Sequence, residues 1–254
     1  MKNDLYTVLH CHTTSSDGTL THKEILDKCQ EFGIGTVAFT DHDVLMPEQI
    51  FDELKSLNHN VKFISGIEFS ATGIPEVAGE IPSFHIIGLF LDHKNEALNR
   101  YCKIAQEKRR ERVTAVVKNL TEQGFSISEE EIMEKAEDGT LGRPHIVRAV
   151  LEKEENIKVI KETLEKLRIE SQKDQTLTAR YEEIKNHNDF QLMFDLFLSD
   201  HAYVKGVYVP YLKQIPLDFA VKLIRDAGGI ALLAHPSYYR EKLGVDLIEK
   251  LAQE

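Results

Sequence analysis

The feature that most constrains the fold is an alternation in the first third of the chain, where short apolar runs are each followed by an amphipathic stretch. This rhythm is typical of β/α units. It predicts strands at residues 5–12, 36–40, 61–65 and 84–91. Thr21 and Glu24 have the spacing of a helix capping box, and Gly33 and Gly35 are placed to end that helix. We therefore expect an α/β body around a parallel sheet.

The character of the chain changes at about residue 97. From there to about residue 200 it is charged, poor in strand-forming residues and helical in pattern, with a break at 139–144. The stretch 151–188 is rich in Lys and Glu and predicts a solvated helical hairpin. The remaining elements are expected as a strand at 203–209, a helix at 217–227, a strand at 230–234 and a helix at 245–253. We predict a body formed by 1–96 and 201–254, with a helical insertion at 97–200.

Composition limits the partners and the compartment. The net charge of −11 argues against a broad basic surface for duplex DNA. No apolar run reaches the roughly 20 residues of a membrane-spanning helix, so no membrane partner is expected. The chain has three cysteines, Cys11, Cys29 and Cys102. Their odd number and wide spacing argue against a disulfide framework, and a reducing cytoplasm fits best.

His10 and His12 lie where the first apolar run ends. Alternate residues of a strand share a face, so the two imidazoles point the same way. Active sites of β/α folds usually lie at the carboxyl ends of the strands. The pair fits a shared metal ion. The alternative is that the two histidines are ordinary polar residues at the end of a strand. Cys11 alternates to the other face and is expected to pack, not to act as a nucleophile.

Further candidate ligands occupy equivalent positions. Asp41-His42-Asp43 follows the second strand, Glu68 follows the third, His85 opens the fourth and His235 follows the strand at 230–234. Asp17 lies in the turn Ser16-Asp17-Gly18. One such coincidence is weak, but its repetition at four strands predicts a metal centre. Imidazole and carboxylate together suit Zn²⁺, Mn²⁺ or Fe²⁺ better than Ca²⁺.

The ordered series H-C-H, S-D-G-T, F-T-D-H-D, G-I-E, H-I-I-G and A-H-P resembles the polymerase-and-histidinol-phosphatase (PHP) superfamily. The resemblance implies a distorted (β/α)7-type barrel that binds two to three divalent ions (Mn, Zn or Fe). It implies that His10, His12 and Glu68 hold one ion, that Glu68, His85 and His235 hold a second, and that Asp17 and His42 hold a third.

The Ser-Asp-Gly-Thr element is similar to the branch of the family that hydrolyses phosphomonoesters of nucleotides, such as nucleoside 3′,5′-bisphosphates or the 5′ ends of short RNA. Histidinol phosphatases tend to carry His at the position of Asp17. The branch also has a helical insertion with a G-R-x-H-like element, here Gly142-Arg143-Pro144-His145. Arg143 can bind a phosphate through two hydrogen bonds. His145 either contacts substrate or caps a helix.

The resemblance implies hydrolysis by a metal-activated hydroxide. Asp43 is our candidate for proton transfer during catalysis, and an acidic residue beyond Glu254 is the alternative. The family pattern continues past Glu254 with one further Asp and one further His ligand, so we expect partial metal occupancy in residues 1–254, with the second position filled most readily.

Three other functions stay open at this point. They are a non-catalytic metal-binding PHP module, a histidinol-phosphatase-like enzyme and an amidohydrolase-type metal hydrolase. Amidohydrolases also begin with His-x-His, but they place Lys or further His on later strands, and no such residues occupy matching positions here.

Overall fold

The computed structural model describes residues 6–72, 83–136, 139–211 and 215–237. The chain divides into two compact units, one formed by 1–106 with 213–254 and the other by 107–212. Helix α3 (Glu96–Glu122) begins in the first unit and continues into the second. The expected boundaries at 97 and 200 thus lie about ten residues before the observed divisions.

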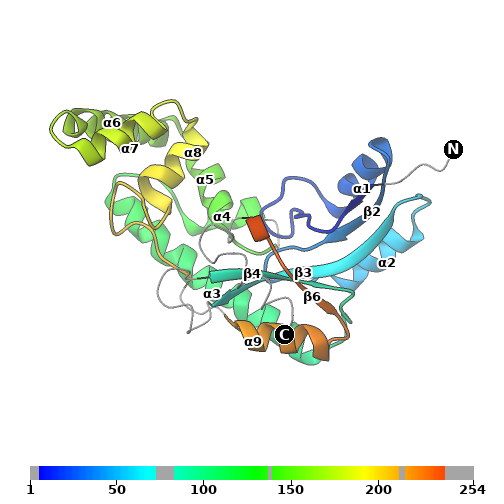
Figure 1. The fold of residues 1–254 in the computed structure, drawn as a ribbon. Coiled ribbons are helices and arrows are strands. Elements are labelled where there is room, and N and C mark those ends of the chain that lie inside the picture. The colour runs from blue at the N-terminus through cyan, green and yellow to red at the C-terminus, as the bar shows by residue number, and fades with distance from the viewer. Residues whose placement is uncertain (1–5, 73–82, 137–138, 212–214, 238–254) are drawn as a thin grey trace. The chain divides into compact units, whose positions relative to one another are not determined.

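The first unit is built on one curled sheet with the strand order β1-β2-β3-β4-β6, and β5 pairs with β3 (Figure 1). Strands β1, β2 and β3 run parallel, whereas β4 runs antiparallel to both β3 and β6. The strands are β1 (Tyr6–Val8), β2 (Ile34–Phe39), β3 (Lys62–Thr72), β4 (Ser83–Leu89), β5 (Ile215–Pro216) and β6 (Ile230–Leu233). This is a mixed α/β fold that matches part of a barrel.

The expectation of a wholly parallel sheet is wrong at β4, which runs antiparallel to both of its neighbours. A parallel crossover needs a dozen or more residues, usually including a helix. Only ten residues separate Thr72 from Ser83, and they include Gly and Pro. Strand β4 therefore returns beside β3, with Ser70 opposite His85. Reversal of β4 brings its first residues to the edge where β1 and β2 end.

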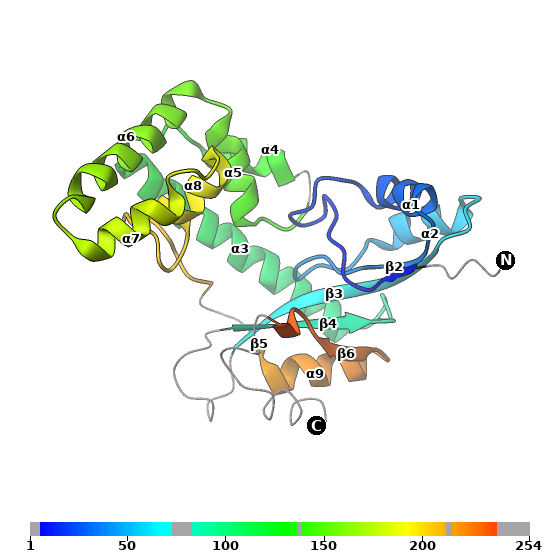
Figure 2. The same ribbon diagram turned by 45° about the horizontal axis from the view of Figure 1, so that its top comes forward.

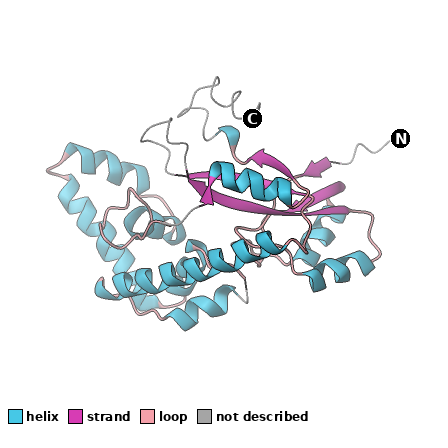
Figure 3. Ribbon diagram, turned by 90° about the horizontal axis from the view of Figure 1, so that it is seen from below, coloured by secondary structure: helices cyan, strands magenta, loops and turns pink. Residues whose placement is uncertain are grey.

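Among the described residues, helices α1 (His22–Glu31), α2 (Glu48–Ser56) and α9 (Leu217–Asp226) and the first turns of α3 pack against the sheet of the first unit. Helices α1 and α2 lie near β2, and α9 packs along β3, β4 and β6 (Figures 2 and 3). The predicted capping box of α1 is confirmed, because the Thr21 side chain accepts from the Glu24 backbone while the Glu24 carboxylate accepts from the Thr21 backbone. Burial of apolar side chains from both partners stabilises each contact.

Strand β1 is shorter than expected, because regular pairing stops at Val8 and leaves His10 and His12 in a loop. Beyond β2, the Thr40 backbone still donates to the Cys11 carbonyl at 2.8 Å. The Cys11 amide, however, donates to the Thr40 hydroxyl at 3.1 Å and not to a backbone carbonyl. A side-chain hydrogen bond thus replaces a backbone hydrogen bond between the two strands at Cys11. Because the regular strand ends here, His10 and His12 can turn toward each other.

The second unit consists of helices in its described residues, which exclude 137–138 and 212. Its core is a single apolar cluster that includes Val116, Leu120, Ile146 and Phe197. Helices α6 and α7 contact each other as the expected helical pair. The elements after α3 are α4 (Glu129–Ala136), α5 (Arg143–Leu151), α6 (Glu154–Ser171), α7 (Gln175–Ile184), α8 (Asp189–Met193) and the π-helix η2 (Phe194–Leu198).

The strand predicted at 203–209 is wrong, because these residues form turns and loop. Val207 does pack in the helical core, which explains the apolar pattern. The carbonyl groups find side-chain partners on α3 instead of a neighbouring strand: Asn119 donates to Val207 and Arg112 donates to Val209. A backbone whose polar groups are satisfied in this way has no need of a sheet.

The expected elements at 217–227 and 230–234 correspond to α9 and β6. The helix expected at 245–253 lies outside the described residues. Among the helices of the described residues, none is long and apolar enough to cross a membrane.

Candidate metal centre

The centre of the site is the carboxylate of Glu68, which is 0% exposed. Glu68 lies inside β3 and not after it, because β3 continues seven residues beyond Ser65, the last residue paired with β2. The backbone of His42 forms an isolated parallel β-bridge with that of Glu68. On β3, Ile67 and Phe69 alternate with Glu68 and pack in the apolar core. The strand therefore holds a charged side chain rigidly on the face opposite its core residues.

Five imidazoles surround this carboxylate. Each places a ring nitrogen 3.0–3.3 Å from a Glu68 oxygen, and the rings are those of His10, His12, His42, His85 and His235. The Nε2 atoms of His10 and His12 are themselves 2.9 Å apart. The rings come from the ends of β1, β2 and β6 and from the start of β4. The antiparallel β4 explains how a histidine at the beginning of a strand reaches the same place.

Two of these ligands have unusual backbones nearby. His235 has a φ of 48°, and Asp43, beside His42, has a φ of 53°. Non-glycine residues rarely adopt this left-handed region, and such strain tends to gather at functional sites. Gly18 serves the same loop differently, since a Cβ there would lie 2.4 Å from the His12 carbonyl oxygen. Glycine thus permits the loop that follows His12 to fold back against it.

Two groups of three side chains have ligand atoms within 4.8 Å of one another, namely His10 with Glu68 and His235, and His12 with His42 and Glu68. Both share Glu68, so its two oxygens can bridge a pair of cations. Asp17 lies at the rim, with Oδ1 3.5 Å from His12 Nδ1 and Oδ2 3.7 Å from His42 Nε2. The structure thus brings together all seven predicted ligands. Its grouping by distance differs from the assignment implied by the resemblance, which stays a prediction.

Protonation in the site follows from its charges. Burial alone would raise the pKa of Glu68, but hydrogen bonds from the surrounding imidazoles hold it well below its usual range. The pKa of His12 is raised, because the hydrogen bond and charge of Glu68 outweigh the effect of burial. The pKa of His235 is lowered by burial and by the neighbouring His10 and His85, despite the attraction of Glu68. One carboxylate among five imidazoles fits divalent metal ions, which neutral imidazole and ionised carboxylate bind together.

Asp43 does not join this cluster. Its side chain is 0% exposed, and Oδ1 accepts from the Tyr101 hydroxyl at 2.6 Å and from the Ser70 backbone at 3.2 Å. Tyr101 is a contact that the sequence did not indicate. These bonds tie the turn after β2 to β3 and to α3. These bonds give Asp43 a structural role, and its part in proton transfer stays a prediction.

Cys11 behaves as expected of a packing residue. Burial, with smaller contributions from Asp41 and Cys29, raises the pKa of its thiol to about 11. The thiol is therefore neutral at physiological pH and a poor nucleophile. All three cysteines are free.

The other predicted residues belong to the second unit. His145 is 1% exposed, and its Nδ1 accepts from the Gly142 backbone at 3.0 Å. It therefore caps α5, which is one of the two roles that the sequence left open for it. Arg143 is half-buried and donates to the Leu198 carbonyl at 3.0 Å. Its guanidinium lies over the rings of Phe194 and Tyr208.

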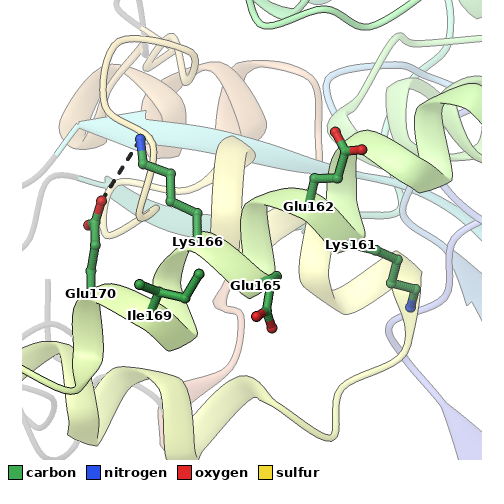
Figure 4. Close-up of a pocket in the computed structure, with 6 residues that line it drawn as sticks. All are labelled: Lys161, Glu162, Glu165, Lys166, Ile169 and Glu170. Carbon is green, nitrogen blue, oxygen red and sulfur yellow. Dashed lines mark ion pairs between the residues drawn. The ribbon is translucent and has the colours of Figure 1, made fainter.

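A separate surface hollow lies on α6 and is drawn in Figure 4. Its charged side chains are exposed, and Lys166 and Glu170 form an ion pair at 4.0 Å. Lys and Glu four residues apart are ordinary neighbours on a solvated helix. The lining residues are Lys161, Glu162, Glu165, Lys166, Ile169 and Glu170. This surface offers no histidine and no buried charge for chemistry.

Comparison with known proteins agrees with the site. The model of the PHP domain matches residues 9–204, and the chain therefore belongs to this family. It is 26% identical over 234 residues to the 5′-3′ exoribonuclease Rnm of Escherichia coli, a match that covers 91% of this chain and 65% of that protein. The chain thus spans just under two thirds of the length of this relative.

Two further matches cover more of their partners. The 3′,5′-nucleoside bisphosphate phosphatase of Chromobacterium violaceum is 26% identical over 246 residues, which are 96% of this chain and 70% of that protein. A solved structure of an amidohydrolase from Chromobacterium violaceum, with bound sulfate and no metal, superposes with a TM-score of 0.70. It has 24% sequence identity, and the match covers 97% of this chain and 72% of that one. This likeness supports the fold.

Proposed function

We propose that this protein is a metal-dependent phosphoesterase that hydrolyses phosphomonoesters of nucleotides, such as nucleoside 3′,5′-bisphosphates or the 5′ ends of short RNA. The observation that carries the proposal is the buried Glu68 carboxylate shared by two groups of ligands. A carboxylate shared in this way can hold two cations a few ångströms apart, which suits a phosphate group. The chain has a net charge of −11, so such cations are the obvious source of positive charge for an anionic substrate.

The residues of the chain have distinct parts in this proposal. Glu68 would be shared by two ion positions, and the imidazoles of His10, His12, His42, His85 and His235 would complete them. Asp17, at the rim beside His42, is suited to a third. We propose two to three ions, with Mn²⁺, Zn²⁺ or Fe²⁺ preferred by the mixed donors. When bound, these ions bind phosphate oxygens and make water acidic enough to attack at neutral pH.

The nucleotide class of substrate rests on the relatives. Their names describe a 5′-3′ exoribonuclease and a 3′,5′-nucleoside bisphosphate phosphatase. The first name describes an enzyme that acts on RNA, and the second an enzyme that acts on a nucleoside bisphosphate. Asp17 agrees with this branch, since histidinol phosphatases of the family tend to have His there.

The test is release of phosphate from adenosine 3′,5′-bisphosphate by the purified protein with added Mn²⁺. Histidinol phosphate and an amide or lactone substrate of amidohydrolases are assayed beside it. Turnover of the bisphosphate alone supports the proposal. Preference for histidinol phosphate or for the amide assigns the site to the corresponding alternative. Tight metal binding with no turnover of any substrate indicates a non-catalytic module.

Arg143 is our candidate for a substrate-phosphate contact, and its neighbours in the second unit support this. Burial, with the nearby charges of Arg143 and Arg109, lowers the pKa of Arg112 to about 10 despite the opposing effect of Tyr208. Arg109 lies over the ring of Tyr211, and Arg112 over that of Tyr208. Gathering three guanidinium groups away from water costs free energy that a bound anion offsets. Arg143 uses one donor on Leu198 and has others for a phosphate.

Replacing Arg143 by Ala is expected to raise KM for a nucleoside bisphosphate by about 10–100-fold, the range for a lost hydrogen bond to a charged group. Steady-state kinetics measures the change. Arg110→Ala is the matched control, because Arg110 is an exposed arginine of the same unit. Equal kinetic constants for Arg143→Ala and Arg110→Ala would assign Arg143 to helix packing alone.

A further inference from the structure

A second buried carboxylate, Asp41, lies next to the proposed ligand His42 but outside the cluster around Glu68. Its side chain is 3% exposed. Oδ1 accepts from the Thr13 backbone at 2.7 Å and from the Ser16 hydroxyl at 2.6 Å, and Oδ2 accepts from the Thr13 hydroxyl at 2.9 Å. His22 Nε2 is 3.7 Å from Oδ2, too far for a hydrogen bond. The three bonds fix the loop that follows His12.

The direction of the Ser16 bond follows from counting protons. The Ser16 hydroxyl donates to Asp41 Oδ1, so its single proton points at that oxygen. Ser16 Oγ can then only accept from its remaining neighbour. That neighbour is Nδ1 of His12, at 3.3 Å. The contact therefore requires a proton on Nδ1.

We propose that Asp41 and Ser16 are positioning residues that hold His12 as the Nδ1–H tautomer and so direct the lone pair of Nε2 toward the metal. This inference rests on the proposed metal site. Nε2 of His12 donates to Glu68 Oε2 at 3.2 Å, and this is the proton that a metal ion would replace. Asp17 Oδ1, 3.5 Å from Nδ1, favours the same proton position from the rim.

The hydrogen bonds from His12 to Ser16 and from Ser16 to Asp41 matter because a histidine can bind a metal only through a nitrogen that carries no proton. A neutral imidazole in water exchanges between its two tautomers. A fixed acceptor at Nδ1 removes the tautomer that cannot bind through Nε2 and also limits rotation of the ring. Groups in this outer position typically change metal affinity or activity by about 10–100-fold when they are replaced.

Ser16→Ala is the cleanest test, because it removes only the hydroxyl. Ser65→Ala is the matched control, since Ser65 is a buried serine of β3 whose hydroxyl has no partner among the described residues. Nitrogen-15 NMR of the imidazole rings in the Zn²⁺-loaded protein reports which nitrogen of His12 carries the proton, and calorimetric titration with Zn²⁺ reports affinity. We expect wild type and Ser65→Ala to show the Nδ1–H tautomer. Ser16→Ala should show a mixture and bind Zn²⁺ about 10–100-fold more weakly.

Asp41→Asn is the second variant. Its amide oxygen has to take the place of Oδ1, because the Thr13 backbone donates there, so the Ser16 hydroxyl keeps an acceptor but loses a charged one. Asp41→Asn should weaken Zn²⁺ binding less than Ser16→Ala does. If Asp41→Asn does not fold, Ser16→Ala alone decides. A wild-type His12 in the Nε2–H form, or a Ser16→Ala variant with unchanged tautomer and affinity, overturns the proposal. The NMR and calorimetric results do not depend on turnover, so failure of the positioning role is distinguishable from absence of phosphatase activity.

Discussion

Replacing Glu68 by Gln is expected to remove metal binding and phosphatase activity together. Glu68 is shared by both groups of ligands, so neutralising it weakens both positions at once. The loss should exceed the roughly 10–100-fold typical of groups one shell further out. Gln has nearly the shape of Glu, so the strand and its packing should persist. Metal content by mass spectrometry and phosphate release measure the two effects.

Glu31→Gln is the matched control for this variant, because Glu31 is exposed at the end of α1, where it pairs with Lys28. It should keep full metal content and activity. Circular dichroism of Glu68→Gln distinguishes loss of the site from loss of the fold. Retained metal content in a folded Glu68→Gln protein would contradict the bridging role.

Removing divalent metal with a chelator is expected to lower thermal stability as well as activity. At a free ion concentration of about 100 times the dissociation constant, binding stabilises the folded state by about 2.7 kcal/mol. For a chain of this size, that corresponds to a fall in Tm of about 5–10 °C on metal removal. The physical reason is that the ions bind the folded protein, in which the imidazoles gather around Glu68, and not the unfolded chain. Scanning calorimetry before and after chelation, and again after adding Mn²⁺, measures the shift.

The matched control for this experiment is the Glu68→Gln variant under the same treatment. Its Tm should not respond to chelator or to added Mn²⁺. A fall in Tm of the same size in the variant would show that the chelator acts elsewhere on the protein.

The sequence predicted the seven residues of the cluster because the same signal recurred along the chain. His42 follows a strand, His235 follows another, and both are recognisable from apolar runs that end in a polar ligand. The capping box at Thr21 was predictable for a local reason, since it depends on two residues three apart. Local patterns therefore indicated which residues matter and where the first helix begins.

Strand direction was not predictable from these patterns. An apolar run looks the same in a parallel and an antiparallel strand, and only the short link between β3 and β4 distinguishes them. The apolar residues near Val207 looked like a strand, but their carbonyl groups bind side chains of α3, a contact distant in sequence. Asp43 was expected in catalysis because it adjoins His42. Its partner Tyr101 lies 58 residues away, and no local pattern reveals that bond.

Asp41 and Ser16 were missed as positioning residues for the same reason. Neither residue type is diagnostic at its position, and Ser16 looks like an ordinary turn residue before Asp17. Their role follows from a hydrogen bond between residues 25 apart in the chain. Such contacts emerge only when the loop after His12 has been placed against the end of β2.

The most direct test of the metal centre is an anomalous-scattering map from crystals of the protein grown with Zn²⁺. The account predicts at least two peaks that share the Glu68 carboxylate, with ligand distances of about 2.0–2.2 Å to its oxygens and to the imidazole nitrogens of His10, His12, His42, His85 and His235. Peaks remote from Glu68, or no peak at all with Zn²⁺ in excess, would contradict it.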